Sequence, residues 1–340
     1  MKRLAPRLFL LLLLLLLPAL APAQPAGNPV PPEETPAQPA DDAEYPEATE
    51  PDVPPGHPVA SWTEAQVELH RRGFSCGSID GVRGLQTATA LKAWQKNEGL
   101  RETGDLDRDT KAALLIAEPA LIEYFFTAED SASTRPVPDT WLEKSQLDAL
   151  RYGSALEMIA QRFRDNPKLL TKLNPTVNWD DLLPGTKLIV PSVSPLLPPL
   201  KVARIHIYLA EKVLQAVDET GRVLLHCPVS IARNVEKRPV GELHIVVVIP
   251  DPNYTFDPVN FPEVPEAAEL GRKLILAPGP NNPVGVAWIG LDRTGYGIHG
   301  TPEPEKVGRT ESHGCFRLAN WDARTLLRLV TVGLPVIVDP

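Results

Sequence analysis

Residues 296–301 read Tyr-Gly-Ile-His-Gly-Thr and residues 312–318 read Ser-His-Gly-Cys-Phe-Arg-Leu, and together they hold the densest cluster of reactive side chains in the chain. A cysteine attacks as a thiolate, and a thiol with an ordinary pKa of about 8.5 is mostly protonated at neutral pH. A nearby imidazole can take that proton and later return it to a leaving amine. His299 and His313 both lie within 16 residues of Cys315. The pattern therefore indicates a cysteine nucleophile with a histidine base.

The neighbours of this cysteine support the same chemistry. Gly314 leaves the backbone beside Cys315 unobstructed, and backbone amides at such a turn can point toward a developing oxyanion. Arg317 adds a fixed positive charge that suits a carboxylate. Two other readings stay open from the residues alone: a buried structural thiol, and a zinc site formed by His299, His313 and Cys315.

Outward from this cluster, the chain from Lys201 onward alternates short apolar stretches with turns. This pattern predicts a sandwich-like or barrel-like, mainly β domain. One helix is expected within it, with Asn320 as its N-cap and Gly333 at its end. The expected strands are 202–209, 213–217, 223–231, 243–249, 284–291 and 336–338.

With His299-Gly300-Thr301 ahead of it and Asn320 to Asp322 behind it, the Ser-His-Gly-Cys-x-Arg run resembles the L,D-transpeptidase catalytic domain of the YkuD type, over residues 200–340. The resemblance implies a cysteine enzyme that forms a thioester with peptidoglycan stem peptides and needs no cofactor or metal. Arg238 stands where the family usually has threonine, in a Thr-Pro-x-Gly motif, and Phe316 where isoleucine or valine is common. The implied catalytic residues are Cys315, His299, His313 and Gly314, and the implied substrate-binding residues are Arg317, Ser312, Tyr296, Gly300 and Thr301.

Residues 61–117 predict a small three-helix module. Ser61 and Glu64 form the pattern of a capping box, and Gly73 is placed to end the first helix. The run from Ile79-Asp80-Gly81 through Trp94-Gln95 to Thr103-Gly104 resembles the peptidoglycan-binding domain of wall enzymes. The resemblance implies binding to the wall polymer.

Residues 150–193 predict two helices followed by a strand, after a connector at residues 118–149. Ser154 with Glu157 opens one helix, and Asn166-Pro167 opens the other. This module resembles a LysM domain, which binds glycan strands, with its N-terminal strand expected near Tyr152-Gly153.

The first 60 residues predict export and a linker. A basic start, the apolar run 8–17 and an Ala-x-Ala site indicate a signal peptide cleaved after Ala23, with no stable membrane anchor afterwards. Residues 24–60 contain eleven prolines and eight acidic residues but no lysine or arginine, which predicts a disordered linker. The expected location is therefore the periplasm or the extracellular cell envelope.

Composition limits the remaining classes. A chain of 340 residues suggests two or three domains, and a net charge of -9 argues against a nucleic-acid partner. Three cysteines cannot form a disulfide framework, although Cys76 and Cys227 could bond each other or serve as separate packing residues. The expected fold is multidomain, and the expected function is peptidoglycan L,D-transpeptidation. The alternatives are an L,D-carboxypeptidase on the same site and a non-catalytic peptidoglycan-binding protein.

Overall fold

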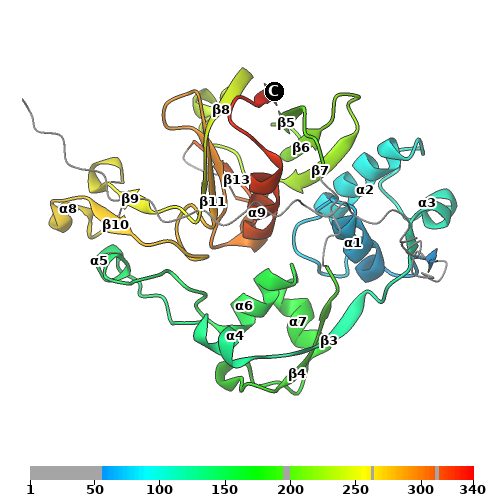
Figure 1. Ribbon diagram of the computed structural model, residues 1–340, viewed down its shortest axis with the longest axis horizontal. Helices are drawn as coiled ribbons and strands as arrows, with labels where there is room; N and C mark the ends of the chain where they lie inside the picture. Colours follow the sequence, from blue (N-terminus) through cyan, green and yellow to red (C-terminus); the bar gives the residue numbers. More distant parts are fainter. Residues whose placement is uncertain (1–55, 194–199, 262–263, 311–313) are drawn as a thin grey trace, which may run out of the picture. The chain divides into compact units, whose positions relative to one another are not determined.

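The computed structural model describes residues 56–193, 200–261, 264–310 and 314–340 (Figure 1). The predicted signal peptide and residues 24–55 of the predicted linker lie outside this range. Within it, no helix is long and apolar enough to cross a membrane.

The first module, residues 56–117, contains the three expected helices. Ser61 Oγ accepts a hydrogen bond from the amide of Glu64, and Gly73 has a positive φ of 85° just after the first helix. The linker was expected to reach residue 60, but Val59 is buried and the two residues before it pair with the end of the module. The elements are β1 (His57–Pro58), α1 (Trp62–Arg71), α2 (Leu85–Asn97), α3 (Arg108–Ala113) and β2 (Leu115–Ile116).

The middle module, residues 121–191, has both expected helices and a strand from the segment that was predicted as a connector. Ser154 and Asn166 cap their helices through hydrogen bonds from backbone amides. The last strand pairs antiparallel with residues 121–125, whereas Tyr152 forms only a single bridge, to Thr134. The elements are β3 (Leu121–Phe125), α4 (Ala128–Ala132), α5 (Trp141–Ser145), α6 (Ala155–Arg162), α7 (Pro167–Leu173), η1 (Trp179–Asp181) and β4 (Lys187–Pro191).

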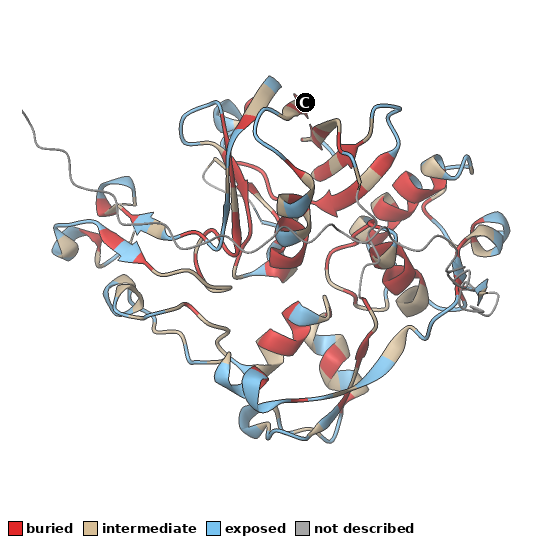
Figure 2. Ribbon diagram, viewed as in Figure 1, coloured by how far each residue is buried: buried red, intermediate tan, exposed pale blue. Residues whose placement is uncertain are grey.

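The C-terminal module, residues 200–340, is built on one mixed sheet of eight strands in the order β13-β12-β11-β8-β14-β5-β6-β7. The longest helix of this module, α9, lies against the sheet, and one face of the helix is buried there (Figure 2). The elements are β5 (Arg204–Tyr208), β6 (Val213–Val217), β7 (Val223–Pro228), η2 (Val235–Lys237), β8 (Gly241–Pro250), β9 (Tyr254–Phe256), η3 (Pro258–Asn260), α8 (Ala267–Leu270), β10 (Leu274–Leu276), β11 (Ala287–Leu291), β12 (Gly297–His299), η4 (Pro304–Lys306), β13 (Phe316–Arg317), α9 (Asn320–Leu329) and β14 (Pro335–Asp339).

The sequence predicted a sandwich-like or barrel-like domain, and the structure has one curled sheet rather than a sandwich. Ser230, just beyond β7, exchanges two backbone hydrogen bonds with Arg317 in β13, at 2.9 and 3.0 Å. The first and last strands of the order therefore meet, and the sheet nearly closes on itself around one apolar core. A single closing sheet, rather than two packed sheets, carries the candidate site.

A hairpin of β9 and β10 extends from this sheet and packs against the segment around α5. The Trp141 ring stacks on Phe256, with centroids 4.1 Å apart, and the Trp141 amide donates to Glu266. Leu150 is fully buried in the same small apolar cluster. The segment between α4 and α6 of the middle module therefore also supports the C-terminal module.

The first module covers the free edge of β7. The amide of Ser75 donates to the carbonyl of His226 at 2.8 Å, and the amide of His226 donates to the carbonyl of Gly73 at 2.9 Å. Ser75 Oγ also donates to Oδ2 of Asp322 in α9, at 2.9 Å. An unpaired strand edge invites pairing with other chains, so this contact protects the sheet.

Candidate active site

Two short strands bring the candidate catalytic residues together. β12 and β13 pair in parallel, with Ile298 opposite Phe316 and His299 opposite Arg317. The amide of Leu318 donates to the carbonyl of His299 at 2.8 Å. His299 and the two residues that follow Cys315 therefore lie on neighbouring strands.

The Cys315 side chain is half-buried. Its Sγ donates to the carbonyl of Gly295 at 3.5 Å. Burial raises the pKa of the thiol, while a backbone hydrogen bond with Gly297 and the charge of Arg317 lower it, and the net shift is upward. The resting thiol is therefore protonated at neutral pH, and attack by this sulfur requires a base.

His299 is arranged to be that base. Its Nδ1 lies 2.6 Å from the carbonyl oxygen of Gly300. Because a carbonyl can only accept, Nδ1 carries the proton and Nε2 keeps its lone pair. Burial is the largest cause that lowers the pKa of His299 to about 4, and the charge of Arg317 lowers it further. The ring, which also stacks on Trp288 at 5.7 Å, is therefore neutral at pH 7 and able to accept a proton.

Asn320 holds the segment that follows this histidine. Its Oδ1 accepts from the amides of Thr301, at 3.1 Å, and Val286, at 3.3 Å. Its Nδ2 donates to Oε1 of Gln161 in α6, at 2.9 Å, and to the carbonyl of Pro280. Asn320 is thus the first residue of α9 rather than its N-cap, which is Ala319, and this corrects the sequence expectation.

Glycine is needed where the backbone passes Asn320. A Cβ on Gly300 would lie 2.3 Å from Oδ1 of Asn320, and one on Gly285 would lie 2.1 Å from the same atom. Gly285 also has a φ of 61°, which disfavours other residues. The amide side chain and the two glycines together fix the path of the backbone at residues 299–301.

The expected substrate-binding residues fall into two groups. The guanidinium of Arg317 makes no hydrogen bond or ion pair with any residue that the structure describes, and it lies on the strand next to His299. By contrast, Tyr296 packs its ring under Arg293 at 4.8 Å, and Thr301 is buried, with its hydroxyl accepting from Glu303. Arg317 is therefore open to a ligand, whereas Tyr296 and Thr301 have structural contacts.

Two predicted residues, Ser312 and His313, lie outside the described residues, and Gly314 precedes Cys315 within them. In the described ranges, no group of three or more His, Cys, Asp or Glu side chains could hold a metal ion. Cys76 and Cys227 are both buried and form no disulfide with each other.

Sequence reasoning missed the roles of Trp288, Tyr254 and Asn320. The pKa of Tyr254 is raised mainly by burial, with Cys315 raising it further and Arg317 lowering it, so the tyrosine lies near both. Its position on β9 gave no signal in the sequence, because the hairpin is not part of the motif. Asn320 had a signal, but a helix-starting asparagine is more often read as a cap.

The matches to known proteins agree with this arrangement. Residues 203–338 match the family described as "L,D-transpeptidase catalytic domain", and residues 59–114 match the "Putative peptidoglycan binding domain". The chain is 28% identical to the "Putative L,D-transpeptidase YkuD" of Bacillus licheniformis over 189 residues, which are 55% of this chain and 95% of that protein. It is 29% identical to the "Probable L,D-transpeptidase YbiS" of Escherichia coli K12 over 231 residues, which are 66% of this chain and 73% of that protein.

Among solved structures, an L,D-transpeptidase from Mycobacterium smegmatis is similar at 20% identity and a TM-score of 0.32, covering 46% of this chain and 64% of that one. The two domain matches include the helices of the first module, the strand that carries His299, and Cys315 with the strand that follows it. Residues 203–338 of this chain belong to the YkuD family of L,D-transpeptidase catalytic domains, and residues 59–114 form a peptidoglycan-binding domain.

Proposed function

We propose that this protein is a peptidoglycan L,D-transpeptidase in which Cys315 forms a thioester with a stem peptide. The observation that carries the proposal is the hydrogen bond from Nδ1 of His299 to the carbonyl of Gly300, on the strand beside Cys315. This bond leaves Nε2 as a neutral base for a thiol that is protonated at rest.

In the proposed reaction, Nε2 of His299 takes the thiol proton as sulfur attacks the carbonyl carbon of the third stem residue. The amides of His313, Gly314 and Cys315 stabilise the oxyanion. The proton then passes to the leaving amine, and D-alanine departs as the thioester forms. An amine of a second stem attacks the thioester, a new amide bond forms, and the thiol regains a proton. Arg317 holds a carboxylate of the substrate near its half-buried position.

Intact-protein mass spectrometry with a carbapenem tests the nucleophile, since such a β-lactam acylates a reactive cysteine of this kind. We expect one adduct on the wild-type protein and none on Cys315→Ala. Cys76→Ala is the matched control, because Cys76 is a buried thiol in the first module, and it should acquire the adduct normally. An adduct that persists on Cys315→Ala would overturn the proposal.

Product analysis distinguishes the alternatives. Incubation with disaccharide-tetrapeptide should give cross-linked dimers and free D-alanine. Tripeptide without dimers would identify an L,D-carboxypeptidase, in which water resolves the thioester. Binding to purified sacculi with no change in products would identify a non-catalytic wall-binding protein.

We also propose that the protein is exported and that its middle module binds glycan. The export proposal is supported by the basic start and apolar run of residues 1–23. The glycan proposal is supported by the helix pair α6 and α7, which, with α4 and α5, lies between the paired strands β3 and β4. N-terminal sequencing of the exported protein should find Gln24 as the first residue. Pull-down of the full chain with purified sacculi tests glycan binding by the middle module.

A further inference from the structure

A cleft with a basic lining lies on the outer face of β5, β6 and β7, next to the end of α2. Its volume is about 430 Å³, and its lining includes Lys96, Arg204, His206 and Arg222. None of the residues that line it is acidic, although the chain contains 43 acidic and 34 basic residues. The cleft shares no residue with the candidate active site.

Arg204 is held in place from behind by a chain of two hydrogen bonds. Nδ1 of His206 lies 3.2 Å from Oδ2 of Asp339, and Nε of Arg204 donates to Nε2 of His206 at 3.1 Å. Since Nε2 accepts here, the ring is neutral and its proton is on Nδ1. The His206 ring also stacks on Tyr208, with centroids 5.6 Å apart and planes at 9°. The Arg204 side chain is therefore fixed before any ligand arrives.

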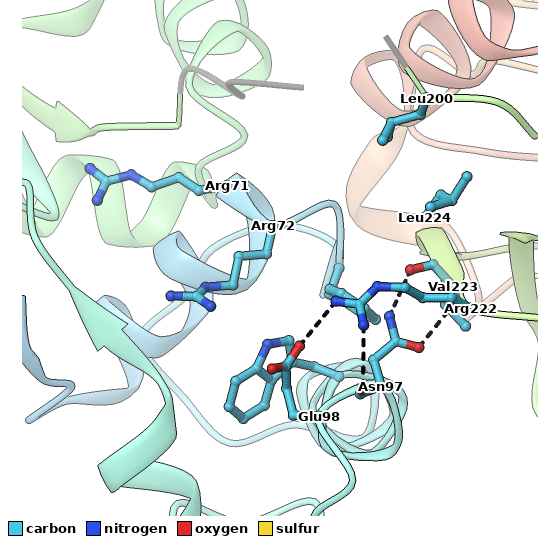
Figure 3. Close-up of a pocket in the computed structure, with 10 residues that line it drawn as sticks. Arg71, Arg72, Asn97, Glu98, Leu200, Arg222, Val223 and Leu224 are labelled. Atoms are coloured by element: carbon cyan, nitrogen blue, oxygen red, sulfur yellow. Dashed lines mark hydrogen bonds and ion pairs between the residues drawn. The ribbon is translucent and has the colours of Figure 1, made fainter. Parts of the chain in front are cut away.

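This arrangement uses only the Nε of Arg204. Its two terminal amino groups make no hydrogen bond or ion pair with any residue in the described ranges. Two parallel N–H groups of a guanidinium match the two oxygens of a carboxylate. The other basic groups differ in this respect, because Arg222 is already bound to Glu98, at 3.3 Å, and to the carbonyl of Asn97 (Figure 3).

Lys96 supplies a second available charge from the other domain. It lies in the last turn of α2, is exposed, and has no ion pair among the described residues. A second hollow lies beside the cleft, with a volume of about 300 Å³, and it is less suitable for binding a carboxylate (Figure 3). There, Arg71 donates to backbone carbonyls and Arg72 pairs with Glu68, so both guanidinium groups already have partners within the protein.

We propose that this cleft binds a carboxylate of the peptidoglycan strand, at a second site separate from that of Cys315. The choice of peptidoglycan as the ligand rests on the proposed function. Its stem peptides carry free carboxylates, which suit the guanidinium of Arg204. Arg204 comes from the transpeptidase domain and Lys96 from the peptidoglycan-binding domain, so the site is formed only when the two domains are docked. It would hold one part of the strand while another part reacts.

The experiment measures binding of disaccharide-tetrapeptide to the mature full chain by calorimetry, with Cys315→Ala present in every protein to prevent turnover. We expect the double variant Lys96→Gln, Arg204→Gln to bind about tenfold more weakly. Lys92→Gln, an exposed lysine on the same helix that does not line the cleft, should bind within twofold of the parent. Ligand whose carboxylates have been amidated should bind weakly to the parent and equally weakly to the double variant.

Equal binding of the ordinary ligand by the parent and the double variant would overturn the proposal. So would inorganic phosphate that binds through Arg204 while disaccharide-tetrapeptide does not. Carbapenem acylation, measured with Cys315 restored, separates this inference from the proposed function. If acylation proceeds at the wild-type rate in the double variant but binding is unchanged, only the cleft is refuted. If the wild type is not acylated, the proposed function fails, and the binding result still decides the cleft.

Discussion

Replacing Asp165 with asparagine should stabilise the protein at neutral pH. Asp165 lies fully buried between the middle module and the first module, where the amide of Asn166 donates to the carbonyl of Ile79. Neither carboxylate oxygen has a hydrogen-bond partner. Burial raises the pKa of Asp165 from 3.8 to about 8, and the nearby Asp80 raises it further.

The size of the effect follows from the difference between the two pKa values. Below about pH 4 the carboxyl is protonated in both states, so it has no effect on stability. Between about pH 4 and 8 the unfolded chain ionises and the folded chain does not, so stability falls by about 1.4 kcal/mol per pH unit. At pH 7 the loss approaches about 4 kcal/mol, and asparagine avoids it at some cost for its own buried amide. We therefore expect Asp165→Asn to gain about 2–4 kcal/mol at pH 7 and nothing at pH 4.

Urea denaturation of the full chain between pH 4.5 and 8.5 measures this difference. Asp322, whose pKa burial raises to about 7, contributes a slope of the same sign in both proteins and cancels when they are compared. Asp180→Asn, at an exposed position in η1, is the matched control and should leave the pH dependence unchanged. A difference between Asp165→Asn and the wild type that is equal at pH 5 and pH 8 would refute the argument, as would a less stable variant at pH 8.

Three further outcomes are expected. Asn320→Ala should lower the rate of acylation by a carbapenem at least tenfold, because the amide of Thr301 loses its acceptor. Circular dichroism should show normal folding. A wild-type rate of acylation would show that the hydrogen bonds of Asn320 do not position His299. Trp141→Ala should destabilise the protein by about 2 kcal/mol and raise hydrogen exchange in residues 254–276, because the stack on Phe256 is lost; uniform exchange in both proteins would contradict this. The acid limb of the acylation rate should fall near pH 4, since the pKa of His299 is about 4; a limb near pH 6.5 would mean that the histidine is not buried during reaction.

Local signals in the sequence predicted local structure well. Ser61, Ser154 and Asn166 each cap the helix that was expected, because a capping side chain bonds an amide only two or three residues away. The long strands of the sheet were also expected, since their apolar runs are bounded by turns. The motif around Cys315 brought His299 and Arg317 into the prediction, and the structure pairs these two residues on neighbouring strands.

What escaped prediction depends on distant partners. β12 and β13 have three and two residues, too few for a pattern, and they exist because their neighbours pair with them. Local signals do not predict β3, because its partner, β4, comes 62 residues later along the chain at its nearest pair. The bond between Asn320 and Gln161 joins two modules, and no local rule gives such a contact.

The contact between β7 and residues 73–75 also bears on how this protein could have been assembled in evolution. Recombination usually joins domains that fold on their own, and the two family matches are separated by 88 residues of sequence. Here the edge strand of the transpeptidase sheet, β7, forms backbone hydrogen bonds with residues 73–75 of the peptidoglycan-binding domain. A chimera that exchanged the first domain for an unrelated one would inherit an open strand edge and an Asp322 that has lost its hydrogen bond from Ser75. The two domains are therefore expected to be inherited as a pair rather than as interchangeable parts.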